Sequence, residues 1–132
     1  FSNYVAKNFR IGERTILQGN MYGFIEPMEA TAVGMYHKLC HCAWDGIFAN
    51  DTFDNCNKII KTNVKQLENI ILWHYQFGSK FDTPFWKYAK SLPFNPDQKF
   101  YDVIKGNLDE DEEYGQWKTW NFDNWRLGNE LV

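Results

Sequence analysis

Two long runs of apolar residues dominate the middle of the chain and restrict its fold most. The first run extends from about Pro27 to Phe48, with apolar residues at positions 28, 32, 35, 36, 39, 43 and 47. The second follows a potential cap at Asn50-Asp51-Thr52 and extends from Phe53 until Gly78 stops it. Within each run the apolar residues recur every three or four positions, which predicts two long amphipathic helices.

Two shorter helices are expected further on, each opened by a capping residue and a proline. Thr83-Pro84 opens one that carries Phe85-Trp86, and Asn95-Pro96 opens one that carries residues 100–104. The acidic residues 109–113 indicate a solvated loop. Beyond that loop the aromatic residues hold no single period, which predicts a docked tail rather than a regular helix.

A strand and a glycine turn lead into the first long helix. Thr15-Ile16-Leu17-Gln18 favours a strand, for which the preceding residues offer no obvious partner. Gly19-Asn20 then suits a sharp turn with positive φ, and Pro27 suits the first turn of a helix. The expected fold class is therefore mainly α with a short N-terminal strand.

Composition narrows the possible partners. Aromatic residues make up 18% of the 132 residues, so we expect some of them to line a pocket or an interface. The net charge of −3 and the absence of a long basic face argue against a nucleic-acid partner. No apolar run approaches the roughly 20 residues that span a bilayer, and no charged-then-apolar leader opens the chain, so a membrane partner is not expected either.

The three cysteines are too few and too irregularly spaced for a disulfide framework, which favours a reducing, cytoplasmic compartment. His37 and His41 share one face of the first long helix, which is the spacing of paired metal ligands. Cys40 and Cys42 point to widely different sides of that helix. At most two ligands then converge, and we predict no metal site.

The start of the first long helix concentrates groups that can carry chemistry. A helix that begins beside a glycine turn offers backbone N–H groups and a partial positive charge to an anion or a cofactor edge. Glu26 and Glu29 also suit this end simply as partners of the helix dipole. Glu29, however, lies one step off the apolar stripe, where a carboxylate is partly desolvated. The Thr31 hydroxyl and the Ala32 amide suit a small anion, although threonines in helices ordinarily bond back to their own helix.

The segment FIEPMEAT, residues 24–31, resembles the F-[IV]-E-P-L-E-[SA]-T signature of the flavin-dependent tryptophan halogenase family. Downstream, LWHY at 72–75, DTPFW at 82–86 and FDNWRLG at 122–128 resemble further elements of that family in the same order. The resemblance spans about Thr15 to Gly128. It implies the C-terminal part of a two-domain FAD-dependent monooxygenase or halogenase-like fold, with 1–26 ending the FAD-domain sheet and 27–132 forming the helical substrate side.

The resemblance also implies roles for individual residues. Glu29 is similar to the family's catalytic glutamate, and Thr31 with Ala32 matches the pair that holds halide. The residues that would approach the flavin ring of FAD are Gly19, Asn20, Gly23 and Phe24. The residues that would form the aromatic wall of a substrate pocket are His74, Tyr75, Phe85 and Trp86, for which ordinary helix packing is the alternative.

The implied reaction is chlorination or bromination of an electron-rich aromatic substrate of the indole or tryptophan type. In the family, reduced FAD from a separate flavin reductase reacts with oxygen to a flavin hydroperoxide, which halide attacks to give a hypohalous species. The family's GxGxxG, catalytic lysine and WxWxIP signature lie upstream of the matched region and do not occur in this sequence. We therefore expect this chain to be a fragment that is inactive alone. A homodimer of the full-length protein is a further expectation.

Two positions depart from the family pattern. Ala32 stands where the best-known tryptophan enzymes have glycine, and Phe81 stands where tryptophan-specific members have a glutamate that receives the substrate's amino group. The second departure favours a less zwitterionic aromatic substrate. Two other functions stay open: a flavin monooxygenase-like protein that does not halogenate, and a non-enzymatic, aromatic-rich helical binding module in which FIEPMEAT only caps a helix.

Overall fold

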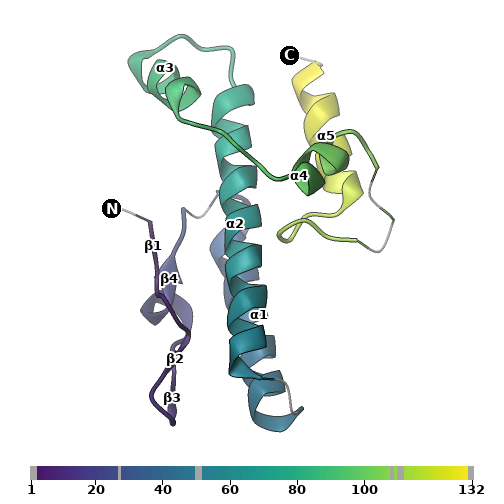
Figure 1. Cartoon of the computed structure of the whole chain (residues 1–132). Coiled ribbons are helices and arrows are strands. Elements are labelled where there is room, and N and C mark those ends of the chain that lie inside the picture. The colour runs from purple at the N-terminus through teal and green to yellow at the C-terminus, as the bar shows by residue number, and fades with distance from the viewer. Residues whose placement is uncertain (1–2, 27, 50–51, 108, 110–111, 131–132) are drawn as a thin grey trace. The chain divides into compact units, whose positions relative to one another are not determined.

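A computed structural model describes residues 3–26, 28–49, 52–107, 109 and 112–130, with the side chains of Glu29 and residues 128–130 outside the described part (Figure 1). The chain forms two compact units, residues 1–64 and residues 65–132. The long helix α2 (Phe53–Phe77) contributes to both of them. In the described residues, no helix is both long enough and apolar enough to cross a membrane.

The first unit begins with two small antiparallel pairs of strands. Strand β1 (Tyr4–Val5) pairs with β4 (Gly23–Phe24), and β2 (Arg10–Ile11) pairs with β3 (Thr15–Ile16). The strand expected at residues 15–18 is therefore present in shortened form. The expectation that it lacks a partner nearby is wrong, because Gly12, at φ 58°, turns the chain back on itself within a few residues.

Helix α1 (Thr31–Phe48) starts later than the sequence suggested. A separate 3-10 turn, η2, covers Met28–Ala30, and Ala30 has a left-handed backbone with φ 56°. That conformation interrupts the helical path, so the prediction of one helix from Pro27 is wrong, while Pro27 itself lies outside the described residues. The buried face of α1 is Thr31, Met35, Leu39 and Cys42, whereas Ile47 of the predicted stripe is 53% exposed.

Helix α2 confirms the prediction at both ends. The Thr52 Oγ1 accepts a hydrogen bond from the Asn55 backbone N at 3.1 Å, which satisfies one of the first amides of the helix. At the other end the Gly78 N donates to the His74 carbonyl oxygen at 2.8 Å. Within the first unit, the Phe53 ring fills the space that a side chain at Gly46 of α1 would need, so these two helices approach closely there.

The second unit adds three short helices: α3 (Pro84–Ser91), α4 (Gln98–Ile104) and α5 (Thr119–Glu130). Helix α3 starts at Pro84, as predicted. Helix α4 starts later than Asn95-Pro96, because the Asp97 carboxylate accepts the Phe100 N–H at 2.9 Å and caps the helix instead. The docked tail expected after the acidic loop is also wrong, because that segment forms α5.

The core of the second unit is aromatic. The Trp73 ring of α2 lies 5.7 Å from Phe100, 5.6 Å from Phe122 and 3.8 Å from Trp125, measured between ring centroids. Phe122 is fully buried, but its neighbour Trp120 is 61% exposed. Because α5 carries large apolar residues on both its inner and outer faces, their spacing in the sequence did not reveal the helix.

Candidate functional site

The glycine turn before α1 is held by two tyrosines. The 3-10 turn η1 (Gly19–Met21) contains Gly19 at φ +54°, so the expected positive φ is confirmed. The Tyr4 hydroxyl donates to the backbone oxygen of Asn20, and the Tyr36 hydroxyl of α1 donates to the Asn20 side-chain oxygen. Tyr36 also lies 3.3 Å from the Gly23 carbonyl oxygen. The turn is therefore fastened to both β1 and α1.

One side of this turn is open. A Cβ atom built on Gly19 would meet no atom within 4 Å, whereas one on Gly23 would lie 2.8 Å from the backbone oxygen of Tyr4. Gly23 is thus needed for strand pairing, and Gly19 presents bare backbone to its surroundings. A flat ligand edge can therefore approach Gly19 closely.

The signature segment, residues 24–31, ends in a buried threonine. Thr31 is fully buried, and its Oγ1 donates to the carbonyl oxygen of Glu26 at 2.7 Å. The hydroxyl therefore does not bond back to its own helix; it ties the two ends of the segment together. Glu29 lies between them in η2, where only its backbone is described. Ala30 makes no side-chain cap to α1 among the described residues.

The four residues expected to form an aromatic wall fall into two groups within the second unit. Tyr75, Phe85 and Trp86 contact one another, with centroid distances of 5.9 Å, 6.0 Å and 5.1 Å. His74 instead lies against Trp117 at 4.9 Å. Its Nδ1 is 2.7 Å from the Ile70 carbonyl oxygen, so that nitrogen carries the proton. Three residues thus form one cluster, and His74 belongs to the aromatic core.

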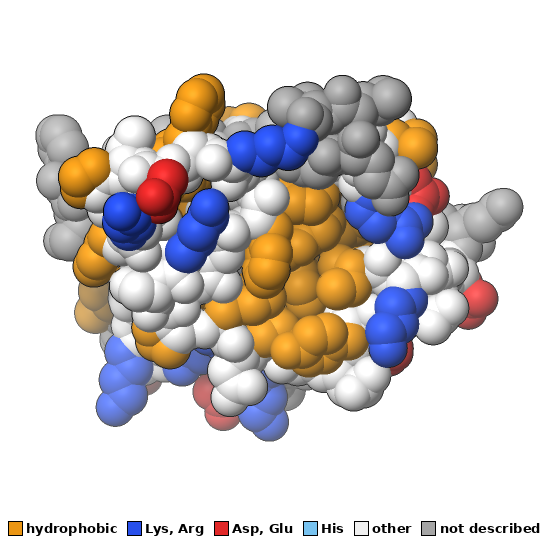
Figure 2. Space-filling model, turned by 90° about the horizontal axis from the view of Figure 1, so that it is seen from above, with side chains coloured by type: hydrophobic (Ala, Val, Ile, Leu, Met, Phe, Trp, Pro, Cys, Tyr) orange, Lys and Arg blue, Asp and Glu red, His pale blue; other side chains and the backbone are white. Residues whose placement is uncertain are grey.

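Large apolar side chains are exposed around that cluster. Phe77 ends α2, Phe81 lies in the following loop, and Phe85 and Tyr88 belong to α3; all four are more than half exposed. Figure 2, which looks down on this end of the molecule, shows apolar side chains gathered in a hollow with Lys and Arg side chains around it. This face can receive an apolar ligand.

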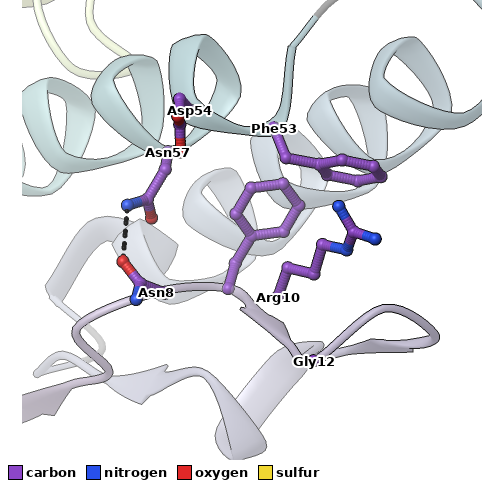
Figure 3. Close-up of a pocket in the computed structure, with 7 residues that line it drawn as sticks. Asn8, Arg10, Gly12, Phe53, Asp54 and Asn57 are labelled. Atoms are coloured by element: carbon purple, nitrogen blue, oxygen red, sulfur yellow. Dashed lines mark hydrogen bonds between the residues drawn. The ribbon is translucent and has the colours of Figure 1, made fainter.

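A small pocket of about 160 Å³ lies in the first unit, away from every residue proposed from the sequence (Figure 3). In this pocket the Arg10 guanidinium lies over the Phe53 ring, 4.3 Å from its centroid. The residues that line it are Asn8, Phe9, Arg10, Gly12, Phe53, Asp54 and Asn57. Since neither the glycine turn nor the signature segment reaches it, this pocket is separate from the candidate site.

The comparison with known families covers both candidate regions. The family model for tryptophan halogenases matches residues 10–128 of the 132. The chain belongs to the tryptophan halogenase family. The resemblance identified in the sequence is thereby confirmed. Among curated proteins, no match was found.

Sequence reasoning missed two residues of this halogenase-family chain, Tyr4 and Tyr36. Tyr36 was read only as part of the apolar stripe of the first helix, and its hydroxyl gave no separate signal. Tyr4 precedes the turn by more than a dozen residues, so only the pairing of β1 with β4 brings it there. Both tyrosines hold the turn at Gly19–Met21 in place.

Proposed function

We propose that this chain supplies the glutamate and halide side of a flavin-dependent halogenase that chlorinates or brominates an electron-rich aromatic substrate. Family membership supports this proposal, and one structural observation carries it. Helix α1 begins at Thr31, directly after the glutamate-bearing turn, and the described residues provide no side-chain cap for it at Ala30. We assign its first amides, which an alanine side chain cannot cap, to an anionic ligand beside Glu29.

Halide would be held by backbone groups. The Thr31 hydroxyl already donates to the Glu26 carbonyl, so the amides of Thr31 and Ala32 are the donors we assign to the anion. The positive end of the 18-residue helix favours negative charge at this point. Because the contact is made by the backbone, alanine can replace glycine at position 32 without removing a donor.

The open turn at Gly19 fits the edge of a flavin ring. We assign contacts with reduced FAD to Gly19, Asn20, Gly23 and Phe24, since Gly19 has free space beside its Cα and the turn is fixed by tyrosine hydroxyls. When bound, reduced FAD with oxygen supplies the oxidising power that makes halide electrophilic. A separate reductase would deliver the reduced flavin.

Glu29 is the proposed catalytic carboxylate. Replacing an aromatic C–H by a carbon–halogen bond releases a proton, and a positioned carboxylate can accept it. We assign Glu26 a structural role instead: its backbone carbonyl oxygen accepts the Thr31 hydroxyl, a bond that does not depend on the glutamate side chain. The two glutamates of the signature thus offer a matched pair, one for chemistry and one for structure.

The substrate wall is assigned to Tyr75, Phe85 and Trp86, whose contacting rings can stack an electron-rich ring. Phe81, at the position where tryptophan-specific relatives have a glutamate, is exposed and apolar. A phenylalanine ring cannot form the ion pair that a glutamate forms with an ammonium group. We therefore propose a simple indole or phenol as substrate in preference to free tryptophan.

The test compares Glu29→Gln with Glu26→Gln in the full-length protein, supplied with FAD, a flavin reductase, oxygen and chloride or bromide. Halogenated product from a panel of indoles, phenols and tryptophan is measured by mass spectrometry, and flavin binding is measured by fluorescence. We expect Glu29→Gln to lower product formation by about 10²-fold or more while flavin binding persists. Glu26→Gln should retain most activity.

Three outcomes would contradict parts of the proposal. Full halogenation by Glu29→Gln removes the catalytic role of that residue. Oxygenated products without halogenated ones point to a monooxygenase-like protein. Strict dependence on tryptophan contradicts the substrate proposal alone, because the halide and flavin assignments do not depend on Phe81.

A further inference from the structure

The Nε2 atoms of His37 and His41 lie within hydrogen-bonding distance of each other on the exposed side of α1. Their Nε2 atoms lie 3.2 Å apart, and their rings are nearly perpendicular, with an interplanar angle of 72°. Both residues are exposed, so the pair does not serve the core of the first unit. The sequence placed the two residues on one helix face and predicted no metal site there, because only two ligands were found; the close approach of the two Nε2 atoms is what the structure adds.

The separation of these nitrogens matches that of two imidazoles bound to one metal ion. With metal–nitrogen bonds of about 2.0–2.1 Å, a tetrahedral angle places two ligand nitrogens about 3.3–3.4 Å apart, and a right angle places them about 2.8–3.0 Å apart. The observed 3.2 Å lies between these values. The two Nε2 atoms are therefore close enough for one cation to bind both of them.

We infer that His37 and His41 chelate one divalent transition-metal ion of the kind that prefers imidazole, such as Cu²⁺ or Zn²⁺. The described residues contain no group of three or more His, Cys, Asp or Glu side chains placed for a metal, so water completes the coordination. Helical spacing preorganises the two ligands, since they meet only when α1 is folded. Bound metal should therefore stabilise this helix.

The site differs from the proposed halide contact. His37 is six residues beyond Thr31, which is about 9 Å along the helix, and at 100° per residue it faces another side. Thr31 is buried, whereas both histidines are exposed. Cation binding can thus be tested without any halogenation assay, and its failure would leave the proposed function untouched.

The experiment titrates the chain with Cu²⁺ and with Zn²⁺ by calorimetry, and records the Cu²⁺ electron paramagnetic resonance spectrum and the thermal unfolding midpoint. His37→Ala and His41→Ala are compared with Lys38→Ala, an exposed neighbour on the same helix, and with Cys40→Ser. Alanine favours helix, so the fold of α1 should persist, which circular dichroism checks.

One cation per chain, hyperfine structure from two nitrogens and a raised unfolding midpoint are expected for the unaltered protein. Each histidine variant should lose about tenfold or more in affinity, together with the rise in midpoint, because chelation becomes single-point binding. Lys38→Ala and Cys40→Ser should change neither. The inference would be overturned if both histidine variants kept the affinity of the unaltered protein, or if Cys40→Ser lost as much affinity as they do. Binding that needs millimolar metal would overturn it as well.

Discussion

The Thr31 hydroxyl joins the two ends of the signature segment at a point from which water is excluded. Its hydrogen bond to the Glu26 carbonyl, at 2.7 Å, spans the turn that carries Glu29 and leads into α1. Thr31 is fully buried and Glu26 is half-buried, so the hydroxyl itself has no water as a substitute partner. A hydrogen bond with a buried partner contributes more to stability than an exposed one of equal length.

Thr31→Val tests this bond with little change in shape. Loss of the donor should lower the free energy of unfolding by about 1–2 kcal/mol, measured by urea denaturation. The matched control is Val33→Thr, the reverse change at a site on α1 that is 65% exposed, which should alter stability by no more than about 0.5 kcal/mol. Equal effects at the two sites would show that the hydroxyl does not fasten the segment.

Single residues were predictable where local chemistry decides them. The positive φ of Gly19 follows from the freedom of glycine in a turn, and the sequence indicated it. The positive φ of Ala30 did not follow, because alanine disfavours that conformation and only the surrounding contacts hold it there. The bonds from Tyr4 and Tyr36 to Asn20 depend on tertiary pairing, which no local pattern encodes.

At the scale of elements, the helices that were predicted best have one apolar face and ordinary caps. Helix α2 satisfies both conditions, with Thr52 at its start and Gly78 after its end. Helix α5 does not satisfy the first, because Phe122 faces the core while Trp120 faces outward. A periodicity argument needs polar residues on the outer face, so the aromatic richness of this segment concealed the helix.

Phe122 is the residue that docks α5 to its unit. Its ring lies 5.0 Å from Trp117 and 5.6 Å from Trp73, and it is fully buried. Phe122→Ala should reduce the free energy of unfolding by about 3–5 kcal/mol, because it removes a large buried side chain and leaves a cavity. The exposed Trp120→Ala should cost no more than about 0.5 kcal/mol. Near-equal costs, measured by denaturant unfolding, would contradict the docking of α5 through Phe122.

At the scale of the whole molecule, each unit contains a fully buried tyrosine, Tyr22 in the first and Tyr114 in the second. The two differ in their partners. The Tyr114 hydroxyl accepts from Asn69 at 2.7 Å and donates to Asp97 at 3.2 Å. The Tyr22 hydroxyl has no hydrogen-bond partner in the described part of the chain. The Tyr114 hydroxyl therefore connects α2 to the cap of α4. The Tyr22 hydroxyl is a polar group whose burial no hydrogen bond in the described part of the chain compensates.

Burial raises the pKa of both tyrosines, and a nearby charge adds to the effect, from Cys42 at Tyr22 and from Asp97 at Tyr114. A raised pKa means that the folded state keeps the neutral phenol where the unfolded chain ionises. Stability from this source is thus complete below the unfolded pKa of about 10 and falls as pH rises above it. For Tyr114, whose pKa is strongly raised, the slope should approach about 1.4 kcal/mol per pH unit in that range. Tyr22 contributes in the same direction.

Phenylalanine variants should separate the two tyrosines. At pH 7, Tyr114→Phe should destabilise the protein by about 1–2 kcal/mol, because Asn69 and Asp97 lose a partner, while Tyr22→Phe should be neutral or stabilising, because it removes an unpaired hydroxyl. Between pH 9 and 11, each variant should lose stability less steeply than the unaltered chain in urea unfolding, and the double variant least steeply. The same slope in all four proteins would show that neither tyrosine stays neutral in the folded state, and that other groups govern alkaline unfolding.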